Sequence, residues 1–161
     1  MRIGMILDKS FPPDPRVENE ALSLIDNNFE VYLFCLSYGD EPLYEVRNGI
    51  HVFRYKSNSF TYKLSALAYS IPGYTLIMAS KISDFIDKNE IQVLHVHDIQ
   101  IAQAVYWANR NRKLSIVLDL HENRPEIMQY YPHVNSFPGS WLISTKRWKK
   151  KEEEYIRKST R

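Results

Sequence analysis

Polar and titratable side chains stand at the ends of apolar runs in this sequence, where buried strands are expected to finish. They are Asp8, Ser10, His97, Asp98, His121, Glu122 and Asn123. Imidazole and carboxylate groups hydrogen-bond hydroxyls and phosphate oxygens, and imidazole also titrates near neutral pH. In open α/β sheets, ligands bind outside the carboxyl ends of the strands. We therefore expect these residues to line one binding edge of a sheet, although strand ends are also polar where they bind nothing.

His121 is the strongest candidate for chemistry, because it directly follows the apolar run VLDL. Its ring can hydrogen-bond a hydroxyl or a phosphate oxygen, or it can be held by Glu122 and only support the site. For His97 a purely structural role is an equal alternative. His95 lies two residues earlier, inside the expected strand, so we expect it to be buried and hydrogen-bonded.

The segment HVHD also bears on metal binding, because imidazoles two residues apart share one face of a strand. No other group of residues has a characteristic metal-ligand spacing, so no metal is expected. Neither G-x-G-x-x-G nor G-x-x-x-x-G-K-[ST] follows the first apolar run, which argues against a dinucleotide or P-loop site. Cys35 lies within an apolar run and is expected in the core.

The composition of the 161 residues is that of one globular domain, with 44% hydrophobic and 25% charged residues. The net charge of +2 is too small to make nucleic acid the expected partner. A single cysteine fits a reducing compartment. The longest uncharged run, 64–80, is shorter than the roughly 20 residues of a membrane span and is broken by Pro72-Gly73. We expect a soluble or peripheral protein.

Five apolar runs predict strands, and amphipathic helices separate them. The strands are expected at 2–7, 31–36, 50–55, 93–97 and 116–120, and the helices after Asp14, over 64–89 with a break at Pro72-Gly73, and over 99–110. Asp14 and Asp98 are expected to cap helices, and Asn48-Gly49 predicts a hairpin or tight turn. This alternation predicts a doubly wound, mainly parallel α/β sheet with helices on both faces. Its strand order is expected to be 3-2-1-4-5, with 2-1-3-4-5 as the alternative.

The C-terminal residues 141–161 predict one helix, in which Trp141, Trp148 and Tyr155 recur every seven residues. The basic run 146–151 could face anionic lipid, but the acidic residues 152–154 that follow favour a solvated helix. The sequence stops where a sixth strand is expected. We therefore expect residues 1–161 to be the first domain of a longer protein.

Several segments match one family in order and spacing. They are DPRVENEALSLIDNNFEVYLFCL, GIHVFRY, VLHVHD and SIVLDLHE. Over most of residues 1–122 the sequence resembles the N-terminal, acceptor-side domain of the family 4 glycosyltransferases of the GT-B fold. The resemblance implies a Rossmann-like domain that forms one half of a GT-B enzyme, with the donor-binding half elsewhere in the same protein.

The resemblance further implies a retaining, hexosyltransferase-type enzyme of cell-surface polysaccharide synthesis. It would use a nucleotide-sugar donor, a glycan or lipid-linked acceptor and no further cofactor or metal. It would be cytoplasmic, with peripheral contact to the inner membrane face as a further expectation. His121 matches the family's histidine near the transferred sugar, and residues 8–16 match the loop that approaches the donor diphosphate.

That loop departs from the family pattern, because SFPPDPRV stands where many members have a Gly-Gly pair. Arg16 could supply charge to the diphosphate instead, or it could only pair with Glu20 one helical turn later. The helix N-terminus after Asp14 would also favour an anion.

Two other classes of protein remain as alternatives. A metal-dependent α/β hydrolase would use HVHD and the HE pair at 121–122. A phospho-receiver-like binding module needs paired acids after the first strand and a lysine after the fifth. Asp8 stands alone and the fifth strand ends in a His-acid pair, which disfavours that module.

Overall fold

The computed structural model of this chain describes residues 1–120, 122–137 and 139–159, and within them it forms a six-stranded sheet. The strands are β1 (Arg2–Ile6), β2 (Glu30–Ser37), β3 (Tyr44–Arg47), β4 (Ile50–Lys56), β5 (Val93–His97) and β6 (Ser115–Asp119). Their order across the sheet is β3-β4-β2-β1-β5-β6, and every neighbouring pair except β3 and β4 is parallel. The five parallel strands therefore follow the predicted order 3-2-1-4-5.

The sixth strand, β3, pairs antiparallel with β4 across the turn that Asn48-Gly49 predicts. Asn48 and Gly49 have φ angles of 51° and 83°, the left-handed values that the two central residues of a tight hairpin require. The predicted hairpin is thus confirmed.

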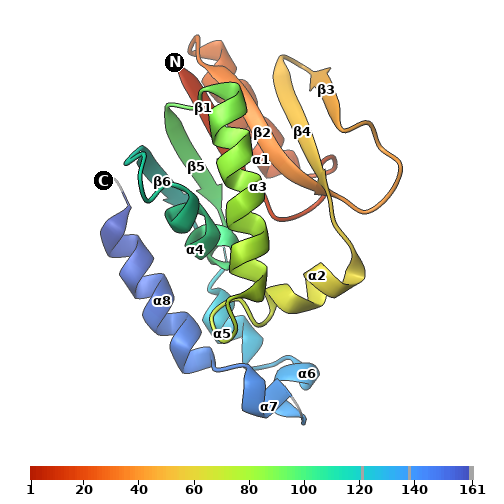
Figure 1. Cartoon of the computed structure of the whole chain (residues 1–161), viewed down its shortest axis with the longest axis vertical. Coiled ribbons are helices and arrows are strands. Elements are labelled where there is room, and N and C mark those ends of the chain that lie inside the picture. Colours follow the sequence, from red (N-terminus) through yellow and green to blue (C-terminus); the bar gives the residue numbers. More distant parts are fainter. Residues whose placement is uncertain (121, 138, 160–161) are drawn as a thin grey trace.

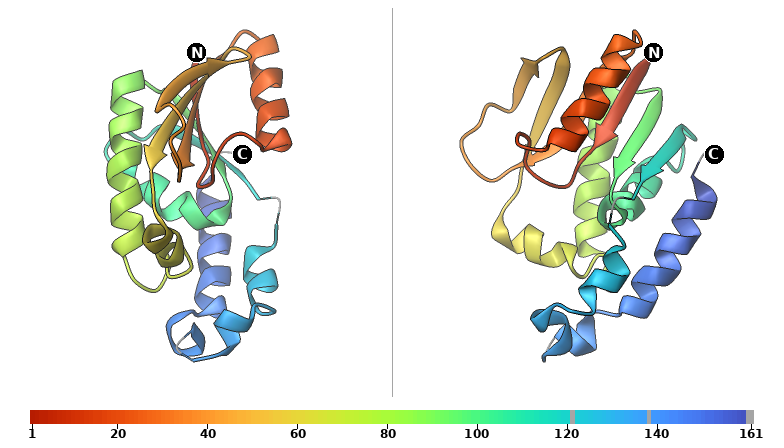
Figure 2. Two further views of the ribbon diagram at one scale, coloured as in Figure 1. Left: turned by 90° about the vertical axis from the view of Figure 1, so that its right-hand side faces the viewer. Right: turned by 180° about the vertical axis from the view of Figure 1, so that it is seen from behind.

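Helices cover both faces of the sheet, as Figure 2 shows in its left view. Their bounds are α1 (Pro15–Asp26), α2 (Ser59–Ser65), α3 (Gly73–Asn89), α4 (Ile99–Ala108), α5 (Arg124–Met128), α6 (Pro132–Asn135), α7 (Gly139–Leu142) and α8 (Thr145–Lys158). α1 covers one face, and α3 and α4 cover the other. The parallel strands point their carboxyl ends toward α2 and α5 (Figure 1). The predicted doubly wound, Rossmann-like sheet is confirmed.

Two buried clusters hold these layers together. On the α1 face, Val17 and Ala21 pack with the inward side chains of β1, β2 and β4, including Cys35. On the opposite face, α3 and α4 pack against the sheet with α8, whose Trp148 is fully buried. Burial raises the pKa of the Cys35 thiol to about 12, so this cysteine is an inert core residue, as predicted.

The two predicted helix caps differ. Asp14 caps α1, because its carboxylate accepts a hydrogen bond from the Val17 backbone N–H at 3.2 Å. Asp98 precedes α4 but makes no capping hydrogen bond, so that prediction is wrong. Its backbone has a φ of 75°, and its Oδ2 lies 3.5 Å from the Nζ of Lys9. Asp98 is thus directed to the strand ends rather than to its own helix.

The prediction of one C-terminal helix from residue 141 is also wrong. Ser144 separates α7 from α8 and caps α8, since its hydroxyl accepts a hydrogen bond from the Arg147 backbone N–H at 3.3 Å. Trp148 and Tyr155 are buried, whereas Trp141 is 82% exposed. The seven-residue spacing therefore reflects a shared face for only two of the three aromatic residues.

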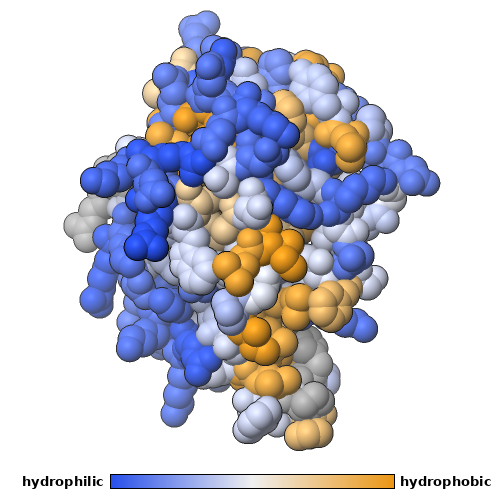
Figure 3. All heavy atoms as spheres, in the orientation of Figure 1, coloured by the Kyte–Doolittle hydropathy of each residue, from blue (hydrophilic) through white to orange (hydrophobic). Residues whose placement is uncertain are grey.

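The basic run lies on α8, where Lys149 and Lys150 are exposed and Glu154 pairs with Lys151 and Lys158. This part of the surface is hydrophilic in Figure 3. A solvated helix explains the run, as the adjacent acidic residues predict. Among the described residues, none of the helices has the length and apolar character needed to cross a bilayer.

Candidate functional site

A buried carboxylate at the carboxyl end of β1 is the centre of the first candidate site. The Oδ2 atom of Asp8 accepts hydrogen bonds from Gln100 Nε2 at 2.7 Å and from the Tyr74 hydroxyl at 3.3 Å. Arg124 Nη2 in turn donates to Gln100 Oε1 at 2.9 Å. The network thus joins the segment after β1 with α3, α4 and α5 at the edge where α/β sheets bind ligands.

Burial makes the Asp8 carboxyl group a weaker acid than an exposed aspartate, with a raised pKa. The side chain is almost fully buried, and burial is the main cause that raises the pKa of Asp8 to about 6, with the Asp98 carboxylate as the second cause. Lys9 and Arg124 act in the opposite direction. A carboxyl group that titrates near neutral pH can accept a hydrogen bond from a hydroxyl and exchange a proton with it.

A cavity of about 690 Å³ adjoins this network. Its lining residues come from α2, α4, α5, α7 and α8 and the segments beside them, and they are Tyr62, Lys63, Ser65, Ala66, Leu67, Gln100, Arg124, Met128, Tyr131, Gly139, Leu142, Ile143 and Trp148. A narrow pocket at Asp8 shares Tyr62, Ser65 and Gln100 with the cavity. Gln100 therefore links the wall of the cavity to the buried Asp8 carboxyl group.

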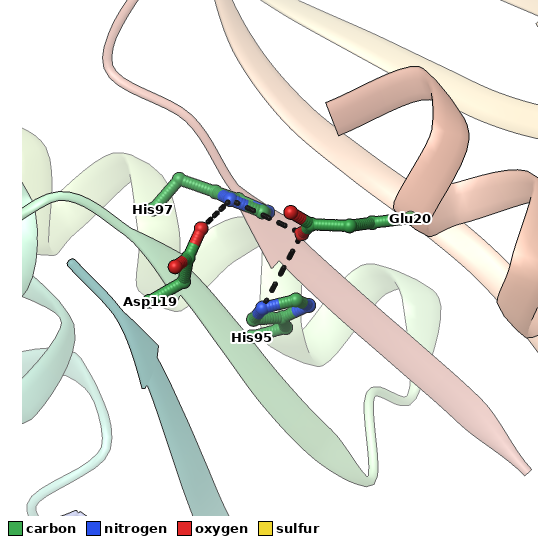
Figure 4. Close-up of side chains that lie close together, drawn as sticks. All are labelled: Glu20, His95, His97 and Asp119. Atoms are coloured by element: carbon green, nitrogen blue, oxygen red, sulfur yellow. Dashed lines mark ion pairs between the residues drawn. The ribbon is translucent and has the colours of Figure 1, made fainter. Parts of the chain in front are cut away.

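A second cluster of titratable residues lies on the α1 face of the sheet (Figure 4). It contains Glu20 of α1, His95 and His97 of β5, and Asp119 of β6, with one ligand-type atom of each within 4.8 Å of the others. Glu20 Oε2 is 3.6 Å from His95 Nε2 and 3.7 Å from His97 Nδ1. His97 Nδ1 is also 3.5 Å from Asp119 Oδ2.

Arg16 places a positive charge on this cluster. Its Nη1 is 2.6 Å from Asp119 Oδ2, and its Nη2 is 3.8 Å from Asp14 Oδ2. Arg16 is thus ion-paired with Asp119 of β6, a partner that neither predicted role of Arg16, charge for the diphosphate or a pair with Glu20, had named. Its guanidinium lies beside the same Asp119 oxygen that approaches His97.

The donor types of the cluster suit zinc, and three of the separations, at 3.5–3.7 Å, are close to the roughly 3.4 Å between ligand atoms of a tetrahedral zinc site, but the whole set spans up to 4.8 Å. Burial lowers the pKa of His95, which favours the neutral imidazole that metals bind. Arg16 opposes metal binding, because its cation already compensates the Asp119 carboxylate. The four side chains of the cluster are of types that bind metal, but the Arg16 guanidinium already supplies a positive charge there.

The two histidines of HVHD are buried in the reverse of the predicted order. His97 is fully buried, although we expected it at the open edge of the sheet. His95, which we expected in the core, is mostly but not fully buried, with 17% of its side chain exposed, and it lines a cavity beside α1 with Glu20 and Asn19. The reason is that α1 covers the end of β5 nearer His97, while its C-terminal half leaves room at His95.

The other predicted site residues do not form one group. Ser10 is exposed, and Asp14 serves as the α1 cap. Glu122 is exposed with its Oε2 3.6 Å from Arg124 Nη1, and the exposed Asn123 caps α5 by accepting from the Glu126 backbone N–H. His121 lies outside the described residues.

Sequence reasoning missed Gln100 and Asp119 as parts of these sites and named Glu20 only as a possible partner of Arg16. Two of them leave a signal, because Glu20 follows Arg16 by one helical turn and Asp119 lies opposite His97 in the β5–β6 register. Gln100 leaves none, since a glutamine in the first turn of an apolar helix has no distinctive spacing.

The fold is similar to that of a solved glycosyltransferase. Neither a protein-family model nor a curated protein sequence matches this chain. The structure superposes on sucrose-phosphate synthase from Thermosynechococcus elongatus with a TM-score of 0.67 and 11% sequence identity. The match covers 98% of this chain and 44% of that protein, so the chain spans less than half the length of its neighbour. It therefore has the fold of one Rossmann-like part of a GT-B glycosyltransferase.

Proposed function

We propose that this chain is the acceptor-side domain of a GT-B glycosyltransferase that transfers a sugar from a nucleotide-sugar donor. The observation that carries the proposal is the buried Asp8 network at the carboxyl ends of the strands, next to a ligand-sized cavity. The shared fold with sucrose-phosphate synthase supports the class of enzyme. The donor-binding domain would lie elsewhere in a longer protein.

The described side chains suit the parts of such a reaction. Asp8, with a pKa of about 6, would accept a hydrogen bond from the attacking hydroxyl of the acceptor. Lys9, beside Asp98, would balance the negative charge that develops on the leaving diphosphate. Arg16, Asp14 at the start of α1 and His121 belong to the same proposal as groups that approach the donor. Ser10, Glu122 and Asn123 would contact substrate from the exposed edge.

The finer expectations belong to the proposal as well. They are membership of family 4, retention of configuration, hexosyl transfer to a glycan or lipid-linked acceptor, and a place in cell-surface polysaccharide synthesis. The enzyme would need no metal or other cofactor, bind no nucleic acid, and act in the cytoplasm at the inner membrane face. The match of DPRV, VLHVHD and SIVLDLHE to the family pattern supports these points.

The test is a transfer assay with a longer protein that contains this chain and a panel of nucleotide sugars. Asp8→Asn should lower kcat by roughly 10²-fold, since the group that orients the attacking hydroxyl loses its charge. Asp26→Asn, an exposed acid at the end of α1, is the matched control and should retain full activity. Absence of transfer from every donor, or full activity of Asp8→Asn, would contradict the proposal.

A second candidate function is favoured by one observation, the four ligand-type side chains at Glu20, His95, His97 and Asp119. A metal-dependent hydrolase of this fold would hold its ion there. Arg16 disfavours that function, because a divalent ion would have to bind within about 5 Å of its guanidinium. Metal analysis of the purified protein distinguishes the two functions, since the hydrolase requires about one tightly bound ion per chain.

A further inference from the structure

A separate cavity of about 570 Å³ lies between α4 and α8. We call it the α4–α8 groove; it extends from Gln103 to Arg110 on one side and from Lys151 to Lys158 on the other. Among the described residues it shares no lining side chain with the cavity beside the Asp8 network. A volume of this size is in the range of sites that enclose small organic ligands. The groove is therefore large enough to be a second binding site.

The charge of the groove is mainly positive. Arg110, Lys151 and Lys158 line it, and Glu154 is the one carboxylate among its described lining residues. Glu154 accepts hydrogen bonds from Lys151 Nζ at 2.8 Å and from Lys158 Nζ at 2.5 Å, and these bonds lower the pKa of Glu154 to about 2. Each ammonium has three N–H donors, so both lysines keep donors for a ligand while Glu154 holds them in place.

Arg110 is the cation of the groove with no partner of its own. Its side chain is exposed and makes no ion pair or hydrogen bond with the other residues that the structure describes. α4 and α8 both run away from the carboxyl edge of the sheet (Figure 1), so Arg110 and Lys158 lie toward the same end of the groove. A guanidinium beside an ammonium is a suitable contact for phosphate oxygens.

Trp107 gives the groove an aromatic face. It is 43% exposed, although most of the apolar residues of α4 are buried. Tyr106 and Tyr155 stack on each other with ring centroids 4.6 Å apart, whereas no ring of the described residues stacks on Trp107. Proteins hold nucleobases by stacking them on aromatic side chains of this kind. The indole of Trp107 is thus available to a planar ring in the ligand.

We infer that the α4–α8 groove binds a nucleoside phosphate, with its base against Trp107 and its phosphate groups at Arg110 and Lys158. Inorganic phosphate would leave the indole uncovered, and an uncharged aromatic compound would leave the cations without a counter-charge. The site is distinct from the Asp8 network, because Trp107 is seven residues beyond Gln100, about 10 Å further along α4. The inference concerns binding and not turnover, so it does not rest on the proposed function.

The first experiment measures binding of uridine diphosphate to the 161-residue chain by titration calorimetry, without divalent metal. One saturable site is expected. Uridine, which lacks the phosphates, and pyrophosphate, which lacks the base, should each bind roughly tenfold more weakly or less, because each makes only part of the contacts. The absence of saturable binding, or pyrophosphate binding as tight as that of uridine diphosphate, would overturn the inference.

Variants with matched controls locate the site. Arg110→Gln should weaken binding of uridine diphosphate by roughly fivefold, whereas Arg157→Gln, at an exposed arginine of α8 outside the groove, should leave it unchanged. Trp107→Leu should weaken binding by roughly threefold or more, and Trp141→Leu, at an exposed tryptophan outside the groove, should not. Circular dichroism checks that all four variants fold. Equal binding by Arg110→Gln and Arg157→Gln would overturn the inference.

One more variant separates this site from the segment proposed to approach the donor. Arg16→Gln should bind uridine diphosphate as tightly as the wild type, because Arg16 lies on the opposite face of the sheet. Binding that is lost in Arg16→Gln and retained in Arg110→Gln would overturn the inference. Absence of sugar transfer by the longer protein would contradict only the proposed function, since the binding assay needs no acceptor and no turnover.

Discussion

Gln100 Nε2 donates a hydrogen bond to Asp8 Oδ2 over 2.7 Å. This bond connects the first turn of α4 to the loop that follows β1. Both side chains are buried, and Arg124 extends the connection to α5 by its bond to Gln100 Oε1. The amide of Gln100 is therefore oriented from both ends, since its nitrogen donates and its oxygen accepts. This leaves the Asp8 carboxyl group fixed in place beside the cavity.

The raised pKa of Asp8 predicts a pH-dependent stability. Folding raises the pKa of the Asp8 carboxyl group from its ordinary value of 3.8 to about 6, so the folded state holds this proton more tightly. Its contribution is fully present below about pH 4, is lost as pH rises to about 6, and stays constant above. The loss amounts to about 3 kcal/mol at 1.36 kcal/mol per unit.

Asp8→Asn removes this titration but keeps an oxygen that accepts from Gln100 and Tyr74. The variant should therefore be more stable than the wild type at pH 7 and lack the decline between pH 4 and 6. Urea unfolding at pH 4, 5, 6 and 7 measures both, with the wild type as reference. If the stability of Asp8→Asn changed with pH as that of the wild type does, folding would not raise the pKa of Asp8, and the prediction would be wrong.

From the sequence, His95 was expected to matter more for stability than His97. Their burial in the structure predicts the reverse. His97→Ala should cost roughly 2–4 kcal/mol, because it leaves a cavity beside Glu20 and Asp119 in the core. His95→Ala should cost less, about 1 kcal/mol, since 17% of the His95 side chain is exposed and it borders an open cavity. Urea unfolding of both variants at one pH decides it, and a larger loss in His95→Ala would refute the burial order.

The sheet was predictable because its information is local. Short continuous apolar runs such as VYLFCL favour strands buried on both faces, and Asn48-Gly49 favours a tight hairpin. The C-terminal break was not predictable from the spacing of Trp141 and Trp148, since a helical stripe and two separate helices share that spacing. The deciding feature is the Ser144 cap, whose effect depends on where α7 packs.

The sites depended on contacts between distant segments. Glu20 and Asp119 are 99 positions apart, and they meet only because the crossover places α1 over β5 and β6. The predicted edge residues Asp8 and Asp98 do lie at the strand ends, but Gln100 joins the site through a side-chain bond with no pattern in the sequence. Strand ends were thus predictable, whereas the partners of each end were not.

The surroundings of Gly4 in β1 leave no room for a side chain. A Cβ atom there would lie 2.8 Å from Ile91 Cγ2 and 3.1 Å from Phe85 Cε1. Gly4→Ala should therefore cost about 1–3 kcal/mol through overpacking. Gly73→Ala at the start of α3 is the matched control, because nothing lies within 4 Å of its Cβ position and alanine favours the helix. Thermal unfolding of both variants should shift in opposite directions; equal shifts would contradict the close approach of β1 to Ile91.

A further prediction concerns the transfer activity of the chain by itself. If the donor-binding half lies elsewhere, purified residues 1–161 should not turn over a nucleotide sugar, because most groups that stabilise the leaving nucleotide are then missing. The assay compares this chain with the longer protein at equal concentration and with a heat-inactivated control. Turnover by the isolated chain well above that control would contradict the two-domain proposal.

The Arg16–Asp119 contact predicts how the protein treats divalent metal. A zinc ion bound to Asp119 would lie about 5 Å from the Arg16 guanidinium, and even at the dielectric constant of water the two would repel by roughly 1.7 kcal/mol. Arg16→Gln should therefore bind Zn²⁺ at least tenfold more tightly than the wild type in titration calorimetry. His97→Gln in the Arg16→Gln background should abolish that gain, which assigns it to the cluster. Tight stoichiometric binding by the wild type, lost on His97→Gln alone, would instead show that Arg16 does not exclude the ion and would favour the metal-dependent hydrolase.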